Sequence, residues 1–144
     1  MAKSLLDLAN SLERKATAIE EAASQTAVDT ALTIVGDLAY KTPVDTSQAL
    51  SNWQVTLDAP ANGKIGPHFP GVQGSSQRSS AAETISRAKA VLANKKPGQV
   101  IFITNNLPYI KRLNDGYSAQ APAGFVERAA LLGRKMVAKF KIKD

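Results

Sequence analysis

Hydrophobic residues recur every three or four positions through the first forty residues of the chain, and no proline interrupts them. This pattern predicts one amphipathic helix ending at about Tyr40. At 1.5 Å per residue it would be roughly 50 Å long, against about 30 Å for the width of a domain of this size. The helix should therefore bend or break near residues 22–26, or one end should project. A projecting alanine-rich helix would be expected to bury itself on another chain. The apolar positions are Leu5, Leu8, Leu12, Ala16, Ile19, Ala23, Ala27, Ala31, Ile34 and Leu38.

Two short segments further along have the composition of strands. Residues 54–57 alternate in polarity, and residues 100–104 are β-branched and aromatic. Ser80 and Glu83 have the spacing of a capping box and predict a helix from there to about Asn94. Other helical segments are expected at residues 46–53, 109–113 and 123–142. The last of these should bury Phe125, Ala129, Leu132, Met136 and Phe140.

These elements predict an α+β fold in a single domain, residues 1–144. A small antiparallel sheet should pack against the long N-terminal helix and the C-terminal helix. Two strands are few for a stable sheet, so one or two more are expected at the flanks of residues 59–80. That segment holds four glycines, three prolines and four serines without periodicity. It is predicted to be a long flexible loop, or an arm that becomes ordered on a partner.

Charge is distributed unevenly along the chain, whose net charge is +6. Residues 1–58 carry four basic and eight acidic side chains, a balance of −4, and residues 59–144 carry fourteen and four, a balance of +10. The asymmetry is compatible with nucleic-acid contact, with contact between the acidic and basic parts of two copies, or with a solvated surface. Cysteine is absent, which suits a reducing cytoplasm. Neither a signal sequence nor a membrane-spanning run is expected.

Candidate chemistry is sparse. His68 is the only histidine and lies within the glycine- and proline-rich segment, away from any rigid frame that would hold a catalytic base. The carboxylates have no metal-binding spacing, so no catalytic residue, metal or cofactor is expected. Trp53, the only tryptophan, is assigned to the core. A basic nucleic-acid-binding module is kept as an alternative because the C-terminal helix is rich in lysine and arginine, although it lacks a recognisable DNA-binding motif.

Two motifs together suggest a family. The first is TPVDTS at residues 42–47, followed by Leu50 and Trp53, and the second is ITNNLPY at residues 103–109, followed by QAPAGFV at residues 120–126. The chain thereby resembles the neck or tail-completion proteins, the head–tail joining family of tailed bacteriophages. The resemblance covers about residues 28–130, apart from residues 59–80. It departs from the family pattern at Ser47, where a glycine is usual, and at Asn114-Asp115.

The resemblance implies a structural virion protein without catalytic activity, which forms a ring at the head–tail junction. The ring would have six copies, with twelve as the alternative, and would be made in the host cytoplasm before entering the virion. Its implied neighbours are portal-side adaptors and the tail terminator or tail tube, with non-specific contact to DNA in the channel left open. A tail terminator that caps the tube is the alternative within this class. Amphipathic and polar residues of the predicted turn and loop are candidates for the interface, namely Tyr109, Arg112, Tyr117 and Gln120.

Overall fold

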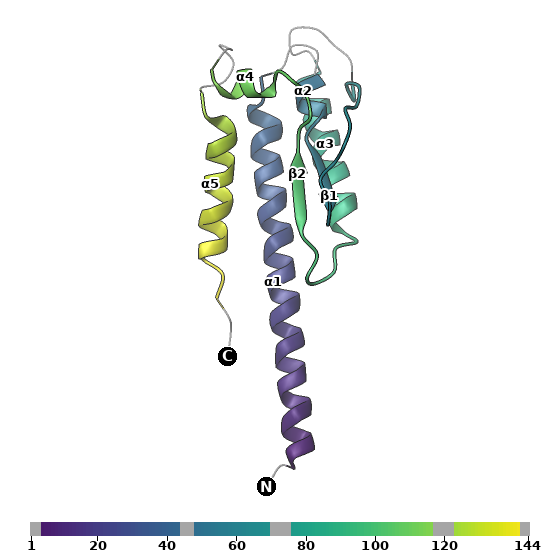
Figure 1. Cartoon of the computed structure of the whole chain (residues 1–144), viewed down its shortest axis with the longest axis vertical. Coiled ribbons are helices and arrows are strands. Elements are labelled where there is room, and N and C mark those ends of the chain that lie inside the picture. Colours follow the sequence, from purple (N-terminus) through teal and green to yellow (C-terminus); the bar gives the residue numbers. More distant parts are fainter. Residues whose placement is uncertain (1–3, 44–47, 70–75, 117–122, 142–144) are drawn as a thin grey trace.

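A single helix, α1 (Leu5–Lys41), runs unbroken through the structure. The computed structural model describes residues 4–43, 48–69, 76–116 and 123–141. A capping box starts α1: the Ser4 hydroxyl accepts a hydrogen bond from the Asp7 amide (3.1 Å), and the Asp7 carboxylate accepts one from the Ser4 amide (3.3 Å). The bend or break expected near residues 22–26 is absent. The alternative expectation, that one end projects, is confirmed, because the N-terminal half of α1 extends beyond the other elements (Figure 1).

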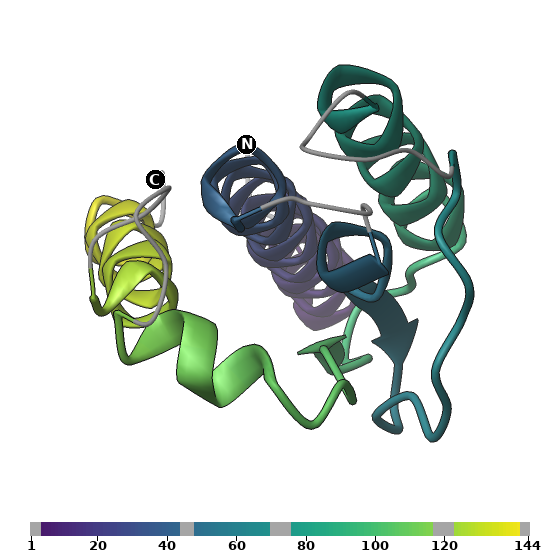
Figure 2. The same ribbon diagram turned by 90° about the horizontal axis from the view of Figure 1, so that it is seen from above.

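The C-terminal half of α1 lies between two layers. On one side is α5 (Phe125–Ala138), and on the other are α3 (Gln77–Leu92) and a two-stranded sheet, as the view along α1 shows (Figure 2). The strands β1 (Gln54–Leu57) and β2 (Ile101–Thr104) pair antiparallel, with Val55 opposite Ile103. Two short helices complete the described chain, α2 (Gln48–Ser51) and α4 (Ile110–Asn114). The predicted α+β fold is confirmed.

Buried residues of α1 contribute to all three apolar clusters of the core. Ala31 and Val35 pack with α3 and the inner face of the sheet. Leu38 packs with Trp53 and with Phe125 of α5, and Ala39 packs with α2 and α3. Three of these four α1 residues have small or β-branched side chains, which allow the neighbouring elements to approach closely.

The structure corrects three details of the sequence interpretation. First, α3 begins at Gln77, so Ser80 is a buried residue inside the helix, and its amide donates to the Ser76 carbonyl (2.9 Å). Second, α5 ends at Ala138 and turns Gly133 inward, while Leu132 is 37% exposed. Third, the described residues contain only the two strands β1 and β2, without the additional ones expected beside them.

The segment predicted as a flexible loop, residues 59–80, consists of parts that differ in the structure. Residues 59–69 carry no regular element but are tied to the body at several points. The Asn52 side chain bonds both the carbonyl and the amide of Ile65 (2.8 Å each), and the Asn106 side chain donates to the Ala61 carbonyl (2.8 Å). Residues 77–80 belong to α3, and residues 70–75 lie outside the described residues.

Two glycines in helix interiors give a matched stability test. A methyl group added at Gly133 would lie 2.9 Å from Cγ1 of Ile34 and closer still to its Cδ1, whereas one added at Gly36 would meet nothing within 4 Å. Replacing glycine by alanine in a helix gains up to about 1 kcal/mol, but overpacking a tight contact costs about 1–3 kcal/mol. We expect Gly36→Ala to stabilise the chain and Gly133→Ala to destabilise it, both measured by urea unfolding. Stabilisation by Gly133→Ala would contradict the close contact between α1 and α5.

A buried hydrogen-bond chain at the end of α1 gives a second test. The Trp53 indole N–H donates to the Thr42 hydroxyl (2.7 Å), which donates to the Leu38 carbonyl (2.6 Å). Thr42→Val preserves the shape of the side chain but leaves the indole N–H without an acceptor, which costs about 1–3 kcal/mol. Thr42→Ser keeps the acceptor and loses only a methyl group. We therefore expect the valine variant to unfold at lower urea concentration than the serine variant, and the reverse order would refute the assignment.

Candidate functional site

The predicted interface lies partly on α4, at the end of the molecule opposite the N-terminus (Figure 1). Tyr109 precedes the first residue of α4 and is 38% exposed, and its partial burial raises the pKa of its phenol. Arg112 lies on α4 itself and is exposed. The structure thus brings these two residues together on one surface. The other two predicted interface residues, Tyr117 and Gln120, lie outside the described residues.

Asparagine side chains position this surface. After β2, the Asn105 side chain donates to the Ala49 carbonyl (2.9 Å) and accepts from the Leu107 amide (3.2 Å), which turns the chain away from the sheet. Leu107 is buried, so the turn that carries Pro108 and Tyr109 is anchored at its base. The result is a rigid support for a surface that faces outward.

Asn114 joins α4 to α5. The residue before α5, Gly124, has φ of +81° and offers no side chain to cap the helix. The Asn114 side chain, which is distant in sequence, supplies the cap instead, because its oxygen accepts a hydrogen bond from the Val126 amide (2.9 Å). Its amide group also donates to the Glu127 carboxylate (2.8 Å), and this bond lowers the pKa of Glu127. Asn114 thereby holds α4 and α5 together.

His68 lies against buried hydroxyl groups. Its Nδ1 is 3.4 Å from the Thr84 hydroxyl, and its backbone amide donates to the Ser51 hydroxyl (2.9 Å). Thr84 is 2% exposed, Ser51 is fully buried, and the Thr84 hydroxyl also reaches the Leu50 carbonyl (3.3 Å). These contacts pack the loop that carries His68 onto α2, through Ser51, and onto α3, through Thr84.

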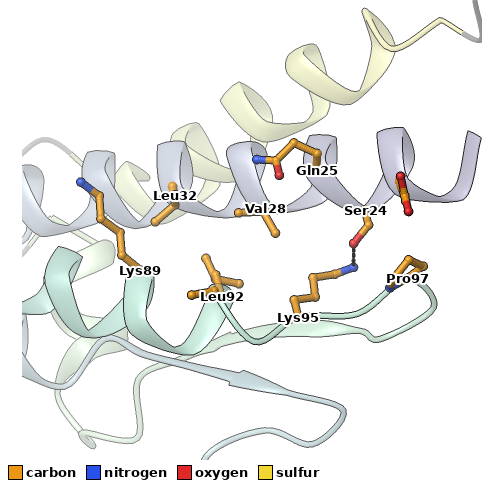
Figure 3. A pocket seen from close by; sticks show the side chains of 10 residues that line it. Ser24, Gln25, Val28, Leu32, Lys89, Leu92, Lys95 and Pro97 are labelled. Atoms are coloured by element: carbon orange, nitrogen blue, oxygen red, sulfur yellow. Dashed lines mark hydrogen bonds between the residues drawn. The ribbon is translucent and has the colours of Figure 1, made fainter. Parts of the chain in front are cut away.

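A shallow groove of about 430 Å³ lies between α1 and the C-terminal end of α3. Its floor includes Val28 and Leu92, and at one end the Lys95 ammonium donates to the Ser24 hydroxyl (2.7 Å), as Figure 3 shows. Sequence reasoning did not identify this groove, because it depends on where the loop after α3 meets α1. Within the described residues, Ser24 is the position nearest the N-terminus of α1 that forms a hydrogen bond with the rest of the molecule.

Beyond that bond, α1 has an exposed apolar stripe. Four leucines near the N-terminus are at least half exposed: Leu5 (86%), Leu6 (69%), Leu8 (51%) and Leu12 (58%). We refer to residues 5–24 as the projecting half of α1. Exposed leucines gathered along a helix mark a surface for contact with another chain. The described part of the chain leaves these leucines uncovered.

Comparisons with protein-family models, with curated proteins and with solved structures found no match. Among the described residues, no helix is both long enough and apolar enough to cross a membrane. Within the same residues, histidine and carboxylate side chains do not gather into a group of three or more that could hold a metal ion. The surfaces described above are therefore the features from which a function can be argued.

The environment of His68 generates a pH prediction. Burial, followed by the positive charge of Arg87, lowers the pKa of His68 below its ordinary value of 6.5. The unfolded chain then binds a proton more readily than the folded chain, so acidification through and below about pH 6.5 favours unfolding. We expect the unmodified chain to lose more stability than His68→Gln when the pH falls from about 7.5 to about 5, as measured by urea unfolding. Equal losses in the two proteins would contradict a destabilising protonation of His68.

Proposed function

We propose that this chain is a structural subunit of a ring at the head–tail junction of a tailed bacteriophage, in the neck or tail-completion class. The observation that carries the proposal is the projecting half of α1. It displays a stripe of leucines along a helix that leaves the body of the molecule. Helices in proteins gain most of their stability from packing an amphipathic face, so this half of α1 fits a chain that works within an assembly.

The resemblance in sequence specifies which assembly. Its two motifs lie in the chain around Thr42–Trp53 and around residues 103–126. Residues of the first motif end α1 and bury Trp53, and residues of the second form β2, the turn to α4 and the start of α5. Both motifs thus contribute to one end of the molecule, where they support the surface with Tyr109 and Arg112. This favours a common structural role for the two motifs.

The chemistry of the described residues also favours contact over catalysis. His68 packs against the hydroxyls of the buried residues Ser51 and Thr84. Asp58 accepts hydrogen bonds from Gln99 and from the Val100 amide at the end of the sheet. The projecting half of α1 and the outer face of α5 expose leucines and charged side chains to a partner. Such surfaces suit protein–protein contact.

Loss of the protein from a phage that encodes it tests the proposal. We expect full heads and tails of normal length that fail to join, visible by electron microscopy of the lysate, with joining restored when purified protein is added. Abnormally long tails would instead indicate a tail terminator, the alternative in the same class. Infectious particles formed in normal yield without the protein would refute both.

A further inference from the structure

The projecting half of α1 has an apolar stripe with an acidic edge. Leu5, Leu8, Leu12 and Ile19 are exposed and are spaced by three, four and seven positions, which places them on one face of the helix. Glu13 and Glu20 lie seven positions apart along one edge of that stripe, two turns or about 10.5 Å along the axis. Neither glutamate forms an ion pair with any described residue. The charge of residues 4–24 is two basic minus four acidic side chains, or −2.

This stripe continues an interface that the molecule already uses. Further along α1, the same face reaches Thr30 and Ile34, which contact Gly133 of α5. Because α5 ends at Ala138, it covers only the C-terminal half of the face, and the remainder runs on uncovered towards the N-terminus (Figure 1). The uncovered part of this face therefore offers apolar surface to a helix of another chain.

The outer face of α5 has the complementary pattern. Leu131 and Leu132 are 49% and 37% exposed, and they are flanked by exposed Arg128 and Lys135, again seven positions apart. Neither basic side chain forms an ion pair within the part of the chain that the structure describes. Residues 125–141 carry five basic side chains and one acidic, a balance of +4. Each helix thus carries two charges of one sign seven positions apart, with apolar side chains between them, and the sign on α5 is opposite to that on α1.

We infer that the projecting half of α1 docks on the outer face of α5 in a second copy of this chain. The contact places Leu12 and Ile19 against Leu131 and Leu132 of the neighbour and pairs Glu13 and Glu20 with its Arg128 and Lys135. It is heterologous, so each copy offers one surface to each of two neighbours, which is the kind of contact that builds a ring when the rotation between copies closes. The inference rests on the proposed function, because it names the contact that would build the ring. A symmetric antiparallel pair of projecting halves would instead bring the Glu13 and Glu20 edges of both copies together, which their like charges oppose.

Cysteine crosslinking tests this contact directly, because the chain has no cysteine of its own. Ala16 lies midway between Glu13 and Glu20, and Leu131 lies near the middle between Arg128 and Lys135. Ala16 of one copy and Leu131 of the other should therefore be close whether the two helices pack parallel or antiparallel. We expect an oxidised equal mixture of Ala16→Cys and Leu131→Cys proteins to give crosslinked dimers containing one of each. The double variant should give a ladder of larger species. Crosslinking of Ala16→Cys with itself alone, or no crosslink at millimolar protein concentration, would overturn the inference.

Charge reversal provides the second test and its control. Glu13→Lys/Glu20→Lys and Arg128→Glu/Lys135→Glu should each reduce self-association at least tenfold in sedimentation experiments, and mixing the two variants should restore it. Glu21→Lys/Asp29→Lys makes the same change of charge on α1 away from the stripe and should have little effect. Circular dichroism checks that each variant remains folded.

The outcomes separate this contact from the proposed function. If the unmodified protein assembles and neither reversal weakens its assembly, the contact between α1 and α5 is wrong while the ring remains. If heads and tails join normally without the protein, the proposed function fails, whatever the crosslinks show.

Discussion

The packing of α1 through its C-terminal half is the constraint on which the rest of the structure depends. Val35 and Ala39 are fully buried, and neighbouring residues of the same helix face α5 on one side and the sheet and α3 on the other. Three separate apolar clusters therefore pack against the same helix, and displacement of α1 would expose all three to solvent. The close contact of Gly133 with Ile34 shows how little space remains on the α5 side. The two short strands that the structure describes can form a stable sheet under these conditions because the helix behind them supports it.

The same packing makes the molecule asymmetric along its length. At the end where α1 finishes, the side chains of Thr42, Asn105 and Asn114 tie together loops and helix ends through buried or partly buried hydrogen bonds. At the other end, residues 5–24 form a helix whose leucines face solvent. A capping box stabilises its first turn, but capping contributes only about 1 kcal/mol. The projecting half is built as a helix and left without the apolar packing that helices normally obtain within their own chain.

Much of this fold follows from the periodicity of the sequence. The long helix, both strands, the short helix after Pro108 and the final helix could all be predicted, because each has a clear pattern and a clear end. The inward face of α5 could not be predicted in the same way. A pattern of large apolar residues favours Leu132 at the buried position, and nothing in it indicates that α1 is close enough to require Gly133 there. The start of α3 was missed for a similar reason: Ser80 looks like a cap, but it is buried by contacts that are distant in sequence. Of the four predicted interface residues, Tyr109 and Arg112 share a surface, while the groove beside Lys95 had no local signal.

The positions that carry the family resemblance and the positions that would carry the contacts are largely different. The polar side chains of the motifs point inward and form hydrogen bonds with loops and helix ends of the same chain. Examples are Thr42, Trp53 and Asn105, whose hydrogen bonds stabilise the fold. The exposed leucines and unpaired charges lie instead on the projecting half of α1 and on the outer face of α5, mostly outside the motifs. Selection for a fold acts on buried hydrogen bonds and close packing, whereas selection for a partner acts on exposed side chains. In the proposed contact, the fold and the choice of neighbour would therefore depend on different side chains of the same helices.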